Sequence, residues 1–66
     1  MERISFSKSN QKKFIQRVCN GKSLMSFLKE NNVMLNISYS SFKKYYSEQL
    51  TLPLSVFETL CRIGNI

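Results

Sequence analysis

The sequence predicts an all-α fold of four short helices, and three observations support this prediction. Apolar residues recur at i, i+1, i+4, i+5 or at i, i+3, i+4 in four stretches, which is the spacing of one helix face. Serines suited to helix capping precede three of these stretches. The chain has 66 residues, of which 42% are hydrophobic, so we expect one small domain over residues 1–66, either alone or as a module of a larger protein.

The N-terminal residues 1–7 precede the first helix. Ile4 and Phe6 alternate there with polar neighbours, a pattern typical of extended backbone. We therefore expect a short extended segment, either an edge strand or an arm.

The first helix is predicted over residues 10–20. Ser9 is its expected N-cap, and Asn20-Gly21 can adopt the left-handed conformation that ends a helix. Its apolar face consists of Phe14, Ile15, Val18 and Cys19.

The second helix is predicted to begin after Ser23, and Asn31-Asn32 indicates its end. Its apolar face consists of Leu24, Phe27 and Leu28. Residues 32–37 are apolar but too few for periodicity to decide between a helical extension and a buried connector.

The third helix is predicted over residues 38–48, with Ser38 as its N-cap. Phe42, Tyr45 and Tyr46 recur at i, i+3, i+4, and we expect Phe42 and Tyr45 in the core. The opposite arc carries hydroxyls and cations, namely Tyr39, Ser40, Lys43, Lys44 and Ser47.

The fourth helix is predicted to include Pro53 in its first turn, because proline lacks only an N–H that is not needed there. Its apolar face consists of Val56, Phe57, Leu60 and Cys61. Gly64 is the expected left-handed residue just beyond its end.

The charge balance indicates an anionic partner. Ten Lys and Arg stand against four Glu, which gives a net charge of +6. Cations that displace counterions from phosphates give such chains affinity for nucleic acid. Charge alone fits equally well a basic domain that binds acidic protein surfaces, or one whose charge only keeps it soluble.

An enzymatic role is not expected. The chain has no His and no Asp, and its four Glu are scattered at positions 2, 30, 48 and 58. Two isolated glycines cannot form a phosphate-binding loop, and two Cys without His cannot complete a structural zinc site within one chain. We expect no cofactor and no metal, and Cys19 and Cys61 to act as small apolar residues.

Neither a membrane span nor a secretory signal is predicted. No apolar run approaches the ~18 residues of a transmembrane helix. The N-terminal stretch "MERISFSKSNQKK" lacks the apolar region of a signal peptide. We expect a soluble, cytoplasmic protein with no membrane partner.

Three stretches in this order, "SLMSFLKENN", "ISYSSFKKYYSE" and "LPLSVFETLCRIGN", carry a family resemblance. Over roughly residues 10–64 the chain resembles the lambda-repressor-like (Cro/Xre-type) helix-turn-helix domains. The third helix of that family opens with an apolar residue, a Ser or Thr cap and a core residue, here Ile37, Ser38 and Phe42. The resemblance implies a DNA-binding helix-turn-helix module that acts in transcription regulation or targets an attached domain.

Three features depart from the family pattern. Eight residues separate Leu28 from Ile37, so the tight turn between the two helices is lengthened or replaced, and the chain has no Ala for the family's small residue. Glu48-Gln49 stands where the family often has Gly. No length remains after Ile66 for the fifth helix that helps many relatives dimerise, which leaves homodimerisation or attachment to a larger protein open.

The resemblance also implies a DNA interface, because the family places its third helix in the major groove. Carried onto matching positions, it implies double-stranded DNA as the partner of Lys22, Ser23, Tyr39, Ser40, Lys43 and Lys44. Lys44 fills the slot from which relatives reach a base, and Lys can donate to guanine O6 and N7. Lys43 is expected at a phosphate, and the start of the second helix at another.

Two alternatives to duplex DNA remain open. The chain could be a protein-interaction module whose basic helix docks an acidic partner. It could also bind RNA if Tyr39 and Tyr46 both face solvent, since readers of single strands stack bases on exposed aromatic rings.

Overall fold

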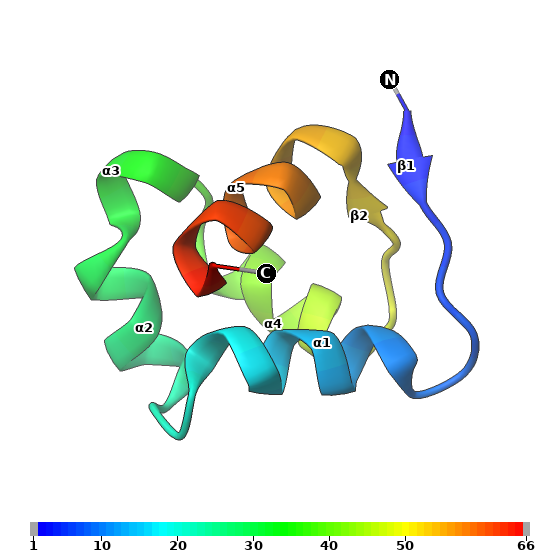
Figure 1. Cartoon of the computed structure of the whole chain (residues 1–66), viewed down its shortest axis with the longest axis horizontal. Coiled ribbons are helices and arrows are strands. Elements are labelled where there is room, and N and C mark those ends of the chain that lie inside the picture. Colours follow the sequence, from blue (N-terminus) through cyan, green and yellow to red (C-terminus); the bar gives the residue numbers. More distant parts are fainter. Residues whose placement is uncertain (1, 66) are drawn as a thin grey trace.

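Residues 2–65 are described by a computed structural model, and most of them are helical (Figure 1). Met1 and Ile66, which the predicted domain includes, lie outside the described residues. In chain order the elements within residues 2–65 are β1 (Arg3–Ile4), α1 (Asn10–Cys19), α2 (Leu24–Glu30), α3 (Asn32–Leu35), α4 (Tyr39–Tyr46), β2 (Leu52–Pro53) and α5 (Leu54–Gly64). The prediction of a mainly helical chain is confirmed. The predicted number of helices is wrong, because α3 forms where periodicity could not decide.

Helix α1 begins at Asn10, as predicted, and ends at Cys19, one residue before the predicted end, but its N-terminus is not capped in the predicted way. Asn20 and Gly21 have φ angles of 52° and 88°, the left-handed conformation that glycine tolerates best. Ser9 is itself left-handed, with a φ of 72°, and its side chain makes no capping hydrogen bond. Instead, the carboxylate of Glu48 accepts hydrogen bonds from the amides of Ser9 at 2.9 Å and Lys12 at 3.0 Å. A side chain that is 36–39 positions away in the sequence therefore caps α1.

Helix α2 follows its predicted signals closely. The Ser23 hydroxyl caps its first turn as expected. The helix ends before Asn31, whose side chain donates to the Phe27 carbonyl at 2.9 Å. Helix α3 then occupies residues 32–35 and ends at Asn36, which is left-handed with a φ of 50°.

Helix α4 is shorter than predicted, because it ends at Tyr46 and Glu48 leaves the helical path with a φ of 66°. Its N-cap is confirmed, since the Ser38 hydroxyl accepts a hydrogen bond from the Ser41 amide at 3.1 Å. Its apolar face is also confirmed, because Phe42 is fully buried.

Both ends of α5 differ from the prediction. Pro53 is the N-cap residue of the helix instead of a member of its first turn. Gly64 is the last helical residue, and Asn65, with a φ of 55°, takes the left-handed position expected of Gly64. The side-chain amide of Asn makes this conformation less unfavourable than for most residues.

The extended N-terminal segment is an edge strand. It pairs antiparallel with β2, with Arg3 opposite Pro53. The Arg3 guanidinium donates to the carbonyl of Thr51 at 2.6 Å and to its hydroxyl at 2.7 Å. The Leu54 amide donates to the Glu2 carbonyl at 2.9 Å, which satisfies one of the unpaired amides at the start of α5.

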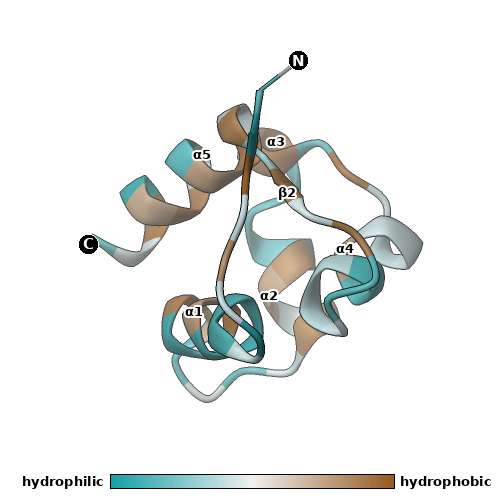
Figure 2. Ribbon diagram, turned by 90° about the vertical axis from the view of Figure 1, so that its right-hand side faces the viewer, coloured by the Kyte–Doolittle hydropathy of each residue, from teal (hydrophilic) through white to brown (hydrophobic). Residues whose placement is uncertain are grey.

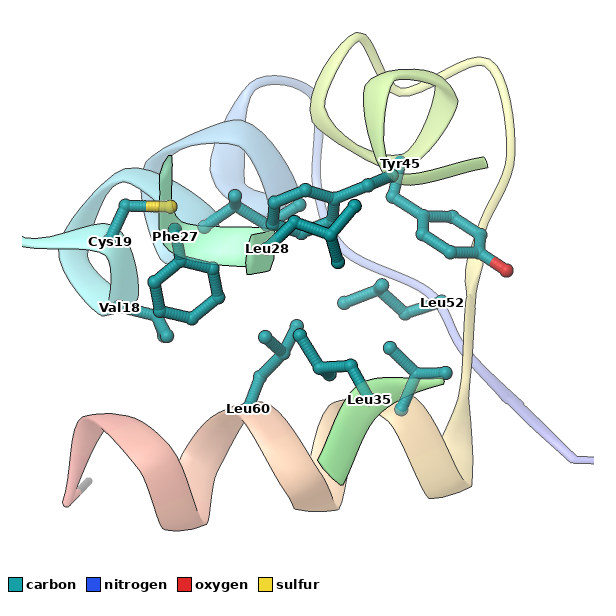
Figure 3. Close-up of a cluster of buried hydrophobic side chains, with 11 residues drawn as sticks. Val18, Cys19, Phe27, Leu28, Leu35, Tyr45, Leu52 and Leu60 are labelled. Carbon is teal, nitrogen blue, oxygen red and sulfur yellow. The ribbon is translucent and has the colours of Figure 1, made fainter. Parts of the chain in front are cut away.

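The core lies between α5 and the other helices. Figure 3 shows side chains from α1, α2, α3, α5 and β2 that point toward one another, including Val18, Phe27, Leu35, Leu52 and Leu60. The rings of Phe27 and Phe42 stack at a centroid distance of 5.8 Å and so join α2 to α4. Figure 2 shows that α5 and β2 carry mostly hydrophobic residues, whereas α1 is largely hydrophilic.

Candidate nucleic-acid interface

Helix α4 has one buried face and one exposed face. Phe42 and Tyr45 are buried, with 0% and 8% of their surface exposed. The buried side chain of Gln11 donates to the carbonyls of Tyr45 and Leu50, both at 2.7 Å. These contacts fix the rotation of the helix, so that the four predicted interface residues of α4 are exposed, namely Tyr39, Ser40, Lys43 and Lys44.

The predicted interface residues of α2 and α4 lie along two adjoining hollows. The larger, of about 490 Å³, is lined by Tyr39, Ser40, Lys43 and Lys44. The smaller, of about 480 Å³, is lined by Lys22 and Ser23. Leu24 and Tyr46 line both hollows, so the structure brings all six predicted residues onto one continuous surface. We call these eight residues the α2–α4 face.

The side chains of Tyr39 and Lys43 lie next to each other on the exposed face of α4. The Lys43 ammonium lies 5.5 Å from the centre of the Tyr39 ring, a cation–π geometry. Tyr39 keeps 37% of its surface exposed. Ring and cation therefore form one unit at the start of α4, with the Tyr39 hydroxyl and the ammonium both able to donate to a phosphate oxygen.

Lys22 and Ser23 are exposed but already have partners. The Lys22 ammonium forms an ion pair with the carboxylate of Glu30. The Ser23 hydroxyl accepts a hydrogen bond from the Ser26 amide at 3.1 Å. An exposed ion pair contributes only about 0–1 kcal/mol, so the Glu30 carboxylate can be exchanged for another anion at little cost.

Tyr46 and Leu24 line both hollows but are not among the six residues predicted to contact DNA, and the sequence suggests Tyr46 only as a base-stacking ring in the RNA alternative. The Tyr46 hydroxyl accepts a hydrogen bond from the Gln16 side chain at 2.9 Å, and the Lys12 ammonium lies 5.2 Å from the centre of its ring. Tyr46 is half-buried between the two hollows and links α1 to α4. The sequence contains no signal for this contact, because Gln16 and Tyr46 lie 30 positions apart.

The glutamates do not line the hollows of the α2–α4 face, although the Glu30 carboxylate borders it through its ion pair with Lys22. Of the four Glu, all within the described part of the chain, none lines either hollow. The amides of Lys12 and Ser9 donate to the Glu48 carboxylate and hold the pKa of that group below its ordinary value. Glu48 therefore stays ionised and bound to α1, where its charge is matched by the positive end of the helix.

A metal-binding cluster is not seen in residues 2–65. No three His, Cys, Asp or Glu side chains of this region lie close enough together to hold a metal ion. Burial raises the pKa of the Cys19 thiol, which keeps it protonated. Cys61 is a free, half-buried thiol. None of the described helices has the length and apolar character that crossing a bilayer requires.

The comparisons with protein-family models, with curated proteins and with solved structures found no match for this chain. The α2–α4 face is therefore interpreted from its own chemistry.

Proposed function

We propose that the chain is a DNA-binding helix-turn-helix module, which inserts α4 into the major groove and acts in transcription regulation or in targeting an attached domain. One observation carries this proposal. Six residues selected from the sequence as DNA contacts lie on one surface that holds three lysines, and no glutamate of residues 2–65 lines it. A surface of this kind attracts the phosphate backbone of DNA.

The size of α4 supports this assignment. An α-helix with its side chains is ~10–12 Å in diameter and so fits the ~12 Å wide major groove, and the eight residues of α4, at ~1.5 Å each, extend ~12 Å along its own axis. In the proposed complex, Lys44 donates to guanine O6 and N7, while Lys43 and Tyr39 together hold a phosphate. Ser40 is short and donates to a base or a phosphate at close approach.

The arrangement of α2 and α4 also supports the proposal. Stacking of Phe27 on Phe42 fixes α2 against α4, and α3 takes the place of the family's tight turn. Glu48, at the position where the family often has Gly, adopts the left-handed conformation that Gly favours. Glu48 thus supplies the backbone conformation that the Gly of the family would supply at this position.

Fluorescence anisotropy with labelled random-sequence duplex DNA tests the proposal. We expect micromolar binding at low salt that weakens steeply as salt rises. Contact with four to six phosphates should give a slope of log affinity against log salt of about −4 to −5. A slope near zero, or no binding at low salt, would contradict the proposal and favour a protein partner.

A matched pair of double variants separates the α2–α4 face from net charge. Lys43→Gln with Lys44→Gln should lower the affinity at least tenfold. Lys8→Gln with Lys13→Gln removes the same charge elsewhere, since Lys13 lines a separate hollow beside Phe6. Equal losses in both variants would mean that DNA binds only through the overall charge.

A further inference from the structure

Apolar side chains are exposed in one part of the chain. The large hydrophobic residues with the most exposed surface are Met25 (50%), Val33 (94%), Met34 (49%), Tyr39 (37%) and Leu50 (41%). All but Leu50 fall on α2, α3 and the first turn of α4. Single exposed apolar residues are common, but a cluster of them indicates a surface that another molecule covers.

A groove lies in this part of the surface, and of the exposed apolar residues Met25 and Tyr39 line it, whereas Val33 and Met34 of α3 do not. The groove has a volume of about 530 Å³ and lies between α2 and the start of α4. Its lining is mainly apolar, and the residues that form it are Met25, Leu28, Lys29, Asn32, Ile37, Ser38 and Tyr39. We call it the Met25 groove. It differs from the two hollows of the α2–α4 face and shares only Tyr39 with them.

The charges around the Met25 groove are positive. Lys29 lines it, and the Lys43 ammonium lies over the Tyr39 ring at its other end. Within the described part of the chain no carboxylate lines the groove. Glu30, the carboxylate adjacent to Lys29 in the sequence, is paired with Lys22.

The positive charges around the Met25 groove indicate which kind of partner can bind there. A second copy of the chain would also carry +6, so that self-association would bring like charges together. A partner with apolar residues on one face and carboxylates on its edges would bury Met25 and Ile37 and meet Lys29 with the opposite charge. Met side chains adapt well to such partners because they are unbranched and flexible.

We propose that the Met25 groove docks an acidic amphipathic helix of a partner protein. The apolar stripe of that helix covers Met25 and Ile37, and its Asp or Glu residues lie against Lys29 and Lys43. This mode of recognition places an amphipathic helix in a hydrophobic groove. The docking does not depend on DNA binding and is tested in its absence.

The probe is a fluorescein-labelled synthetic helix of roughly 15 residues, with Leu along one face and Glu elsewhere. Two control peptides accompany it: a scramble of the same composition, which lacks the apolar stripe, and a version with Lys in place of Glu. We expect the acidic amphipathic peptide to bind and both controls to bind at least tenfold more weakly. NMR amide shifts should change mainly between residues 25 and 43.

Two protein variants complete the test. Met25→Ser should weaken peptide binding about tenfold, because it removes an apolar contact from the groove. Leu50→Ser, an exposed apolar residue outside the groove, should leave binding unchanged, and circular dichroism checks that both variants fold. Equal binding of the scrambled peptide, no binding, or an unchanged affinity of Met25→Ser would overturn the proposal. Sedimentation that shows a dimer dissociated by Met25→Ser would overturn it too, in favour of a second copy.

Discussion

Lys43 and Lys44 are adjacent in sequence but differ in their surroundings. The Lys43 ammonium is held near the Tyr39 ring, whereas the side chain of Lys44 makes no hydrogen bond or ion pair within residues 2–65. A cation that is already positioned suits a phosphate, whose place along the groove is the same for every sequence. A cation that is free to extend suits a base edge.

This difference predicts two kinds of loss on substitution. Lys43→Ala should weaken binding to all duplexes about equally and make the salt slope shallower by about 1. Lys44→Ala should in addition relax the preference at one base pair, with a change in discrimination of about 1–3 kcal/mol. Affinities for a panel of duplexes that differ at single positions would measure both effects. A uniform loss in both variants would contradict a base contact by Lys44.

Phe42 is the residue of α4 on which the position of the exposed face depends. Its ring is fully buried and stacks on Phe27. Phe42→Ala should cost about 3–5 kcal/mol and is expected to unfold a domain of this size. Phe42→Leu should cost about 1–3 kcal/mol, and Tyr39→Leu, at an exposed position, less than about 0.5 kcal/mol, as measured by urea unfolding. Equal stability of these two Leu variants would mean that α4 is rotated differently.

At the scale of elements, the start of α1 depends on the loop after α4. Glu48 caps α1 through two backbone amides, and Gln11 returns the contact by binding the carbonyls of Tyr45 and Leu50. Helix α1 and the end of α4, which are distant in the sequence, are thus held together by hydrogen bonds that run in both directions. Since one of them is α4, the cap also fixes the end of the proposed recognition helix.

The Glu48 cap predicts a specific dependence of stability on pH. Its carboxyl pKa is lowered by folding, so the carboxylate stabilises the fold above the ordinary value of 4.5, and this contribution is lost as the pH falls through the lower folded pKa. Glu48→Gln should therefore be less stable than the parent at neutral pH, with the gap narrowing below pH 4.5. Urea unfolding at a series of pH values would measure this. Glu58→Gln, which removes an exposed carboxylate on α5, is the control for the loss of one negative charge.

The sequence predicts those elements whose signals are local. Ser23 and Ser38 cap their helices through neighbouring amides, and the spacing of Phe42 and Tyr45 correctly identifies the buried side of α4. The sequence cannot decide between a helix and a connector at α3, because four residues are too few to show a helical period. The failed cap at Ser9 and the position of Tyr46 both depend on partners 30 or more positions away, which no local pattern encodes.

At the scale of the whole molecule, a cluster of aromatic rings joins the N-terminal segment to α1 and α5. Phe6, Phe14 and Phe57 lie with their ring centroids between 5.1 and 5.9 Å apart. None of the three lines either hollow of the α2–α4 face. The cluster therefore contributes to stability at a site separate from the proposed interface.

This separation predicts that stability and DNA affinity can be changed independently. Phe6→Ala should cost about 1–3 kcal/mol, which lowers the melting temperature by about 4–20 °C. At temperatures where the variant is folded, its affinity for duplex DNA should equal that of the parent. Thermal unfolding followed by circular dichroism gives the first quantity, and anisotropy the second. A loss of affinity in the folded variant would mean that the N-terminal segment contributes to the interface.

The pairing of β1 with β2 has a consequence for protein synthesis. The Arg3 side chain binds Thr51, 48 positions further along the chain, so that the strand has no partner until nearly all of the described chain has left the ribosome. Closing so long a loop is unfavourable until other contacts hold its ends near each other. The helices are thus expected to assemble first, and the N-terminal strand to join them last. Until then its backbone remains exposed, and the charge of Arg3 helps to keep it from pairing with another nascent chain.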